Sequence, residues 1–289
     1  MMTSPTKPHS HNLGKVYLVG AGPGAADLIT VRGAKLLAKA DIVLHDALVD
    51  EQMLELCPQA IKVAVGKRCG KLSSAQQFIN KRLLDAAKQH QVIVRLKGGD
   101  PMLFGRADEE ITALKEAGIE VEVVPGITAA LAGAASLQQS LTLRGVSRSV
   151  AFVTLAQAAD GTQDEQGQKI QQPISNPSAD TLVYYMGRKD AAKIAQQLIE
   201  QSPNQRTDTP VYILEAVSTK RERLWSSTLG ELAQGKADDW FDASSPALIM
   251  VGAALRNIAQ ASERLESLSP KIDNRLQDSQ IFTNRRRRA

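Results

Sequence analysis

The chain has 289 residues, 43% of them apolar and 23% charged, which is ordinary for a globular enzyme and sufficient for one large or two medium-sized domains. Four consecutive arginines, Arg285 to Arg288, account for the formal net charge of +4, because the remaining basic residues equal the 31 acidic ones in number. The rest of the chain is therefore electrically balanced, which argues against a nucleic-acid-binding protein.

Cysteine and histidine are scarce. Cys57 and Cys69 lack CxxC spacing, and only His45 and His90 lie within the expected fold. These residues predict neither a disulfide framework nor a metal site. Residues 1–13 are polar and contain prolines, and no apolar run of 18 residues occurs anywhere. We therefore expect a disordered leader over residues 1–13 and a cytoplasmic protein without a signal peptide or membrane span.

The first half of the chain alternates between strand and helix patterns. Apolar, β-branched runs predict strands at 15–19, 41–46, 61–65, 92–94 and 121–124. The intervening segments have helical periodicity at 28–40, 51–56 and 78–87 and around 111–114. This alternation is typical of a parallel sheet covered by helices, so we predict an α/β domain over residues 14–140.

A different pattern follows a polar stretch at 138–148, which we interpret as a linker. Strands are expected at 150–154, 181–186, 211–215, 223–227 and 247–251, with a helix at 191–200 and a long surface loop over 157–180. These elements predict a second, mixed α/β domain over residues 149–258. Residues 265–289 are expected to form a polar, basic tail.

The strand that contains Val92 to Val94 leads into two glycines, an aspartate and a proline (98–101). Adjacent glycines allow a backbone to approach a ligand closely, and an aspartate before proline favours an extended conformation. Ligands of open α/β sheets bind beyond the carboxyl ends of the strands. The segment is either an ordinary tight turn or a ligand-binding loop.

A glycine-rich loop follows the first strand. Gly20 to Ala25 satisfies the dinucleotide pattern GxGxx(G/A), and Asp46 lies about where a ribose-binding acid would be expected. Pro23, however, stiffens the loop and removes a backbone donor, which suits a pyrophosphate poorly. A Rossmann oxidoreductase remains an alternative, but it would leave KGGDP (97–101) and PGITAA (125–130) unexplained.

Taken together, five ordered loops resemble the tetrapyrrole (corrin/porphyrin) methylase family: GAGPG (20–24), HDALV (45–49), GKR (66–68), RLKGGDPMLFGR (95–106) and PGITAA (125–130). YMG (185–187) and PALIMVG (246–252) extend the resemblance over residues 14–255. The resemblance implies two α/β domains with S-adenosylmethionine in the cleft between them. The loops are most similar to those of members that methylate uroporphyrinogen III at two pyrrole carbons, giving precorrin-1 and then precorrin-2 for sirohaem and cobalamin.

The resemblance also implies roles for individual residues. Asp46 matches the family's proposed proton acceptor, and Lys67 matches its proposed proton donor. Arg106 is a candidate for the carboxylates of the substrate, because a guanidinium fork suits such groups. The expected contacts to the methyl donor are Pro23, Gly98, Gly99, Asp100, Leu103, Thr128, Ala129, Met186 and Val217. Family members usually form homodimers, and we expect the same here.

The chain departs from the family pattern at His45, where relatives have a tyrosine, at residues 105–110, where they have GRGGEE, and in two further segments. Residues 139–144 lack the expected proline and histidine, and residues 153–156 read Val-Thr-Leu-Ala instead of VTGH. Both are expected near the substrate side of the cleft. Two further alternatives therefore stay open: a family methyltransferase for another precorrin, a ribosomal RNA base or diphthine, and a catalytically weak, donor-binding paralogue. The length before residue 14 leads us to expect no fused dehydrogenase–ferrochelatase module.

Overall fold

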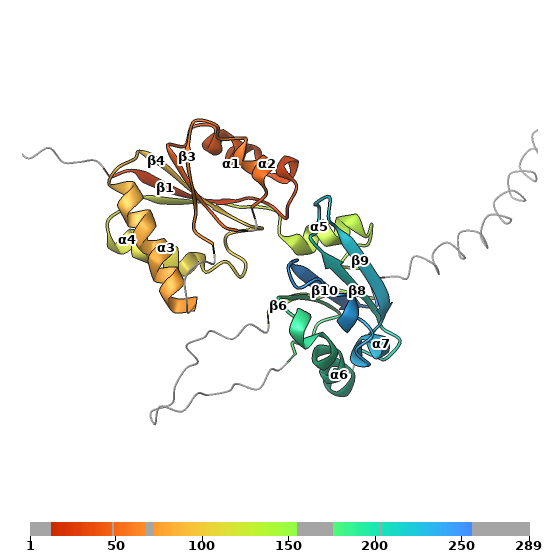
Figure 1. Cartoon of the computed structure of the whole chain (residues 1–289). Helices are drawn as coiled ribbons and strands as arrows, with labels where there is room; N and C mark the ends of the chain where they lie inside the picture. The colour runs from red at the N-terminus through yellow and green to blue at the C-terminus, as the bar shows by residue number, and fades with distance from the viewer. Residues whose placement is uncertain (1–12, 48, 67–71, 155–175, 203, 256–289) are drawn as a thin grey trace, which may run out of the picture.

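The computed structural model describes residues 13–47, 49–66, 72–154, 176–202 and 204–255, which form two sheets with their helices (Figure 1). The first sheet has the order β3-β2-β4-β1-β5, and each neighbouring pair is parallel. Its strands are β1 (Lys15–Gly20), β2 (Ile42–His45), β3 (Ile61–Ala64), β4 (Val92–Lys97) and β5 (Val121–Val124). All five strands therefore present their carboxyl ends at one edge.

Helices cover both faces of this sheet. Successive side chains of β4 alternate between two apolar clusters, with Ile93 facing one and Val94 the other. This explains why the strand begins with an unbroken apolar run, Val92 to Val94. The covering elements are η1 (Ala26–Leu28), α1 (Val31–Leu37), α2 (Glu51–Leu54), α3 (Leu72–Ala87) and α4 (Ala107–Glu116). Leu37 and Met53 pack on one face, and Leu83 and Leu114 pack on the other.

The second sheet is mixed, as predicted. Its order is β6-β7-β10-β8-β9, with a parallel β6–β7 pair and antiparallel pairs elsewhere. The strands are β6 (Val150–Thr154), β7 (Thr181–Tyr185), β8 (Pro210–Glu215), β9 (Arg223–Thr228) and β10 (Ala247–Gly252). The remaining elements on this side are η2 (Arg188–Asp190), α6 (Ala191–Gln201), α7 (Leu229–Ala233) and η3 (Asp238–Trp240). Ile194 and Leu232 anchor α6 and α7 to one face of the sheet.

The other face of the second sheet is covered by α5 (Ala129–Ser136), a helix that lies within the residues predicted for the first domain, 14–140. Ala130, Leu137 and Leu141 are buried in one cluster with Val183 and Met250 of the second sheet. The small side chains of α5 let the helix lie close to the strands. Residues 138–148 are not a free linker, because Leu141 within this segment and Leu137 just before it are buried against the second sheet.

Several predictions concern residues outside the described ranges. These are the leader over 1–12, Lys67, most of the expected loop at 157–180, residues 256–258 and the tail at 265–289. Within the described residues, no helix is long and apolar enough to cross a membrane. The same residues contain no group of three or more His, Cys, Asp or Glu side chains suited to a metal ion.

Candidate active site

Two loops meet at the carboxyl edge of the first sheet. β1 and β4 are neighbours, so the loops that follow them lie side by side. The amide of Gly99 donates to the carbonyl oxygen of Gly22 at 2.7 Å, and the amide of Gly22 donates back at 3.2 Å. This pairing explains the glycines that the sequence places in both loops, since the two backbones approach as closely as neighbouring strands.

A third loop, which follows β5, packs on the same junction. Asp100 accepts a hydrogen bond from the amide of Gly126 at 2.8 Å and another from the amide of Met102 at 2.8 Å. A Cβ added at Gly126 would lie 2.3 Å from the carbonyl oxygen of Gly99. Asp100 thus ties two loops together in the structure, and its predicted contact to a donor remains a prediction.

The hydroxyl of Tyr185 joins this junction to the second domain. It lies 2.5 Å from Oγ1 of Thr128 and accepts a hydrogen bond from the amide of Ala130 at 3.0 Å. Thr128 precedes α5 but makes no capping bond of its own, so the tyrosine satisfies one of the free amides at the helix start. Burial raises the pKa of Tyr185, which keeps the hydroxyl protonated. Two predicted donor contacts, Thr128 and Ala129, therefore lie where the two domains meet.

The glycine loop after β1 also reaches the second domain. The amide of Ala25 donates to Oγ of Ser218 at 3.1 Å, and a Cβ added at Gly24 would lie 2.9 Å from the carbonyl oxygen of Val217. Val217 itself is buried. The structure therefore brings the loop containing Pro23 against the loop containing Val217, and the donor contacts predicted for both residues remain predictions.

Several residues in the loops near this junction have left-handed backbone conformations. The positive φ angles of non-glycine residues include 54° at Phe104, 55° at Arg106, 56° at Met186, 48° at Ala216 and 62° at Ser218. Such conformations are costly for residues with a Cβ and concentrate at functional sites. Their side chains are thereby turned in directions that a regular strand or helix would not allow.

Asp46 lies directly after β2, with its side chain 31% exposed. Its Oδ1 atom is 2.5 Å from Nη2 of Arg95, and its Oδ2 atom accepts a longer hydrogen bond, of 3.4 Å, from the amide of Gly98. The predicted proton acceptor therefore lies at the carboxyl edge of the first sheet, beside Gly98, one of the glycines predicted to bind the donor.

The other predicted residues differ in their surroundings. The guanidinium of Arg106 forms a fork on the carboxylate of Glu109, with bonds of 2.6 Å and 2.7 Å. Leu103 is half-buried and donates its amide to the carbonyl oxygen of Asp100 at 3.3 Å. Met186 is 56% exposed next to Tyr185. Lys67 lies outside the described residues, so its role remains a prediction.

A buried polar network behind Asp46 was missed by the sequence analysis. Arg95 and Lys97 of β4 both bond to Oε1 of Glu110 from α4, at 3.2 Å and 3.0 Å, and Gln76 of α3 donates to the same atom at 3.3 Å. Burial, with a contribution from Arg95, lowers the pKa of Lys97. The sequence does contain a sign of this network. Arg95 and Lys97 are two positions apart in an otherwise apolar strand, so both side chains lie on the same face of the sheet.

Comparison with known proteins agrees with this geometry. The sequence profile of the tetrapyrrole (corrin/porphyrin) methylases matches residues 15–233. The chain belongs to this family. A uroporphyrinogen-III C-methyltransferase of Pseudomonas aeruginosa is 42% identical over 245 residues, covering 85% of this chain and 96% of that protein. The chain spans about half the length of the relatives named siroheme synthase. The siroheme synthase of Pseudomonas fluorescens (strain SBW25) is 42% identical over 240 residues, which cover 83% of this chain and 50% of the synthase.

Solved structures of tetrapyrrole methylases share the fold. Uroporphyrin-III C-methyltransferase from Thermus thermophilus, crystallised with S-adenosylhomocysteine, has a TM-score of 0.68 and 38% identity, covering 84% of this chain and 94% of that one. A cobalt precorrin-4 methyltransferase has a TM-score of 0.69 and 26% identity, covering 88% of this chain and 100% of that one. The predicted fold of two α/β domains is thereby confirmed.

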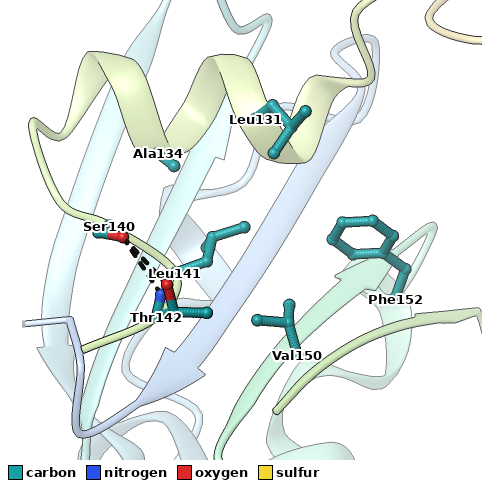
Figure 2. Close-up of a pocket in the computed structure, with 7 residues that line it drawn as sticks. All are labelled: Leu131, Ala134, Ser140, Leu141, Thr142, Val150 and Phe152. Atoms are coloured by element: carbon teal, nitrogen blue, oxygen red, sulfur yellow. Dashed lines mark hydrogen bonds between the residues drawn. The ribbon is translucent and has the colours of Figure 1, made fainter. Parts of the chain in front are cut away.

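Three aromatic rings, those of Phe104, Tyr185 and Phe152, lie in a row between the loop after β4 and a hollow in the second domain of this methylase. The ring of Tyr185 lies 5.1 Å from that of Phe104 and 6.2 Å from that of Phe152, measured between centroids. Beside Phe152, between α5 and β6, is a mainly apolar hollow of about 380 Å³ (Figure 2). Its lining residues are Leu131, Ala134, Ser140, Leu141, Thr142, Val150 and Phe152. The segment that departs from the family pattern, 139–144, thus forms one wall of this hollow.

Proposed function

We propose that the protein is an S-adenosylmethionine-dependent C-methyltransferase that methylates uroporphyrinogen III at two pyrrole carbons, giving precorrin-1 and then precorrin-2. The observation that carries this proposal is the match to a uroporphyrinogen-III C-methyltransferase over 96% of that enzyme's length. The close junction of the three glycine-containing loops, with Asp46 beside it, supports the same conclusion.

The residues at the junction fit a methyl donor. Gly98 is exposed, and a Cβ added at Gly99 would meet no atom within 4 Å, so the backbone of this loop has open space in front of it. In our proposal Thr128 and Ala129 contact the donor from the start of α5, and Met186 and Val217 contact it from the second domain. When bound, S-adenosylmethionine supplies an electrophilic methyl group on a positively charged sulfur.

The chemistry asks mainly for orientation. Methyl transfer forms a carbon–carbon bond and breaks the carbon–sulfur bond, so the positive charge passes from sulfur to the macrocycle. Loss of a proton from a neighbouring carbon then restores neutrality. Asp46 takes this proton in our proposal. During the rearrangement of the ring system Lys67 supplies a proton to one ring carbon while a second proton leaves another carbon for solvent, so the macrocycle stays neutral. Holding the macrocycle carbon in line with the methyl group supplies much of the rate enhancement.

Arg106 is proposed to bind a carboxylate of the macrocycle. In the structure its fork holds the carboxylate of Glu109, and both side chains are more than 40% exposed. A substrate carboxylate has the same geometry and charge as Glu109, so it can replace Glu109 on the guanidinium without uncovering a buried charge. On the family resemblance alone, we also propose that the protein is a cytoplasmic homodimer.

A second candidate function is methylation of a different tetrapyrrole by the same residues. It is favoured by one observation, the altered segment 139–144 that lines the hollow beside Phe152. A different set of side chains at 139–144 would change which macrocycle fits beside Phe152. The loops proposed to bind the donor keep the family's sequence pattern.

One assay separates these possibilities. Purified protein is incubated with S-adenosylmethionine and enzymically generated uroporphyrinogen III, and the products are followed by absorbance and mass. A gain of two methyl groups with the spectrum of precorrin-2 supports the proposal. Donor binding without methyl gain would favour another macrocycle or a weak paralogue, and absence of donor binding would refute the proposal.

A further inference from the structure

β4 carries two charged side chains into the core of the first domain. Arg95 and Lys97 are each 2% exposed, and both lie on the face of the sheet that α3 and α4 cover. Burying ions is costly unless their partners are well placed, and apolar residues of similar volume often stabilise a core equally well. Stability alone therefore does not explain an arginine at this position, and the explanation must come from the groups that Arg95 contacts.

The guanidinium of Arg95 is oriented by the two strands that end at the active site. Its Nη1 atom donates to the carbonyl oxygen of Leu96 on β4 at 3.2 Å and lies 3.5 Å from that of Leu44 on β2. Its Nη2 atom points outward to Asp46, at 2.5 Å. A planar fork held at several points has little freedom, so its outer edge places the carboxylate of Asp46 firmly.

Glu110 holds the inner end of Arg95. It is fully buried, and its Oε1 atom accepts hydrogen bonds from Arg95, Lys97 and Gln76. Among the described residues, its Oε2 atom has no hydrogen-bond partner. Three donors from β4 and α3 thus converge on one oxygen, which fixes Glu110 and through it the guanidinium.

We propose that Arg95 is a positioning residue for Asp46, with Glu110 as its anchor. The inference rests on the proposed function, in which Asp46 accepts a proton from the methylated macrocycle. Arg95 itself is buried and does not touch the substrate. It holds one carboxylate oxygen while the amide of Gly98 approaches the other, so that the carboxylate keeps a single orientation toward the cleft.

The main test is a double-mutant cycle on kcat for methylation of uroporphyrinogen III. Arg95→Met should lower kcat roughly 100-fold, because an Ångström-scale misplacement of a reacting group has that order of effect. KM for the macrocycle and Kd for S-adenosylhomocysteine should change less than about threefold. In an Asp46→Asn background the same substitution should cost less than about threefold, since the group it positions is already gone.

Two further variants separate positioning from general disruption. Lys97→Met is the matched comparison, because Lys97 lies on the same strand and face and bonds to the same oxygen of Glu110. It loses one contact of the anchor and keeps the bond from Arg95 to Asp46, so it should lower kcat by less than about tenfold, clearly less than Arg95→Met does. Arg95→Lys keeps the charge but loses the fork, and it should recover part of the activity lost in Arg95→Met. If Arg95→Met does not fold, Arg95→Lys and Glu110→Gln enter the cycle in its place.

A crystal structure of each folded variant gives a readout that does not depend on turnover. The carboxylate of Asp46 should leave the Gly98 amide in the Arg95 variants and stay there in Lys97→Met. Additive effects in the cycle, an equal loss in Lys97→Met, or an unmoved Asp46 would each overturn the inference. If the wild type fails to methylate uroporphyrinogen III, the proposed function fails, and the crystal structures alone decide the positioning role.

Discussion

Removal of one hydroxyl group tests how the two domains are joined at the donor site. In Tyr185→Phe, the amide of Ala130 and the hydroxyl of Thr128 lose their shared partner, while the ring can keep its contact with Phe104. Each lost hydrogen bond costs about 1 kcal/mol, so the variant should be destabilised by about 2 kcal/mol. With about 2.1 cal/mol/K of unfolding entropy per residue, a chain of 289 residues should then show a fall in Tm of roughly 3–4 °C.

The neighbouring residue offers a matched control. The hydroxyl of Tyr184 points away from the cleft and donates one hydrogen bond, of 2.8 Å, to Oδ1 of Asn176. Tyr184→Phe should therefore lose about 1 kcal/mol and leave the start of α5 intact.

Thermal unfolding and calorimetric titration with S-adenosylhomocysteine distinguish the two variants. Because the first turn of α5 carries two proposed donor contacts, Tyr185→Phe should weaken binding by about tenfold, equivalent to roughly 1.4 kcal/mol. Tyr184→Phe should bind as the wild type does. Since burial raises the pKa of Tyr185, the difference should be the same at about pH 7 and about pH 9. Equal binding by both variants, or an unchanged Tm in Tyr185→Phe, would refute the reasoning.

Three other substitutions give direct tests. Gly126→Ala should weaken donor binding more than tenfold, because its Cβ would lie 2.3 Å from the carbonyl oxygen of Gly99. Gly118 has a φ of 70° and open space around it, so Gly118→Ala should cost about 1 kcal/mol of stability without affecting donor binding. Equal donor affinities of the two variants in calorimetry would contradict this prediction. Asp46→Asn should lower kcat by about 10²- to 10⁴-fold and leave the Kd of the donor unchanged. If the variant methylates at the wild-type rate in single-turnover kinetics, Asp46 is not the base. Met186→Gly should relieve a left-handed φ of 56° and keep the free energy of unfolding within about 1 kcal/mol of the wild type, yet weaken donor binding. A large loss of unfolding free energy in chemical denaturation, with normal donor binding, would show that Met186 has a structural role.

The local sequence was sufficient to predict the strands, because each one is an apolar run that ends at a turn signal. Val92 to Val94 illustrate this, since both faces of β4 are covered and Ile93 and Val94 are fully buried on opposite faces. The ordered loops also sufficed to indicate the family, because their glycines and Asp100 are required by backbone contacts that the structure displays. Donor binding by these loops stays a prediction.

What the tertiary structure decided was which distant groups meet. Neither the alanine-rich segment that forms α5 nor the polar run after it shows, by its own pattern, which of the two sheets it covers. Tyr185 is separated from Thr128 by 57 positions, and Arg95 from Asp46 by 49, so no local pattern identifies these partners. Buried polar groups must find partners wherever the fold brings them together. The sequence by itself therefore determined the elements and the loops of this methylase, and the packing of those elements decided how the residues of its site are held.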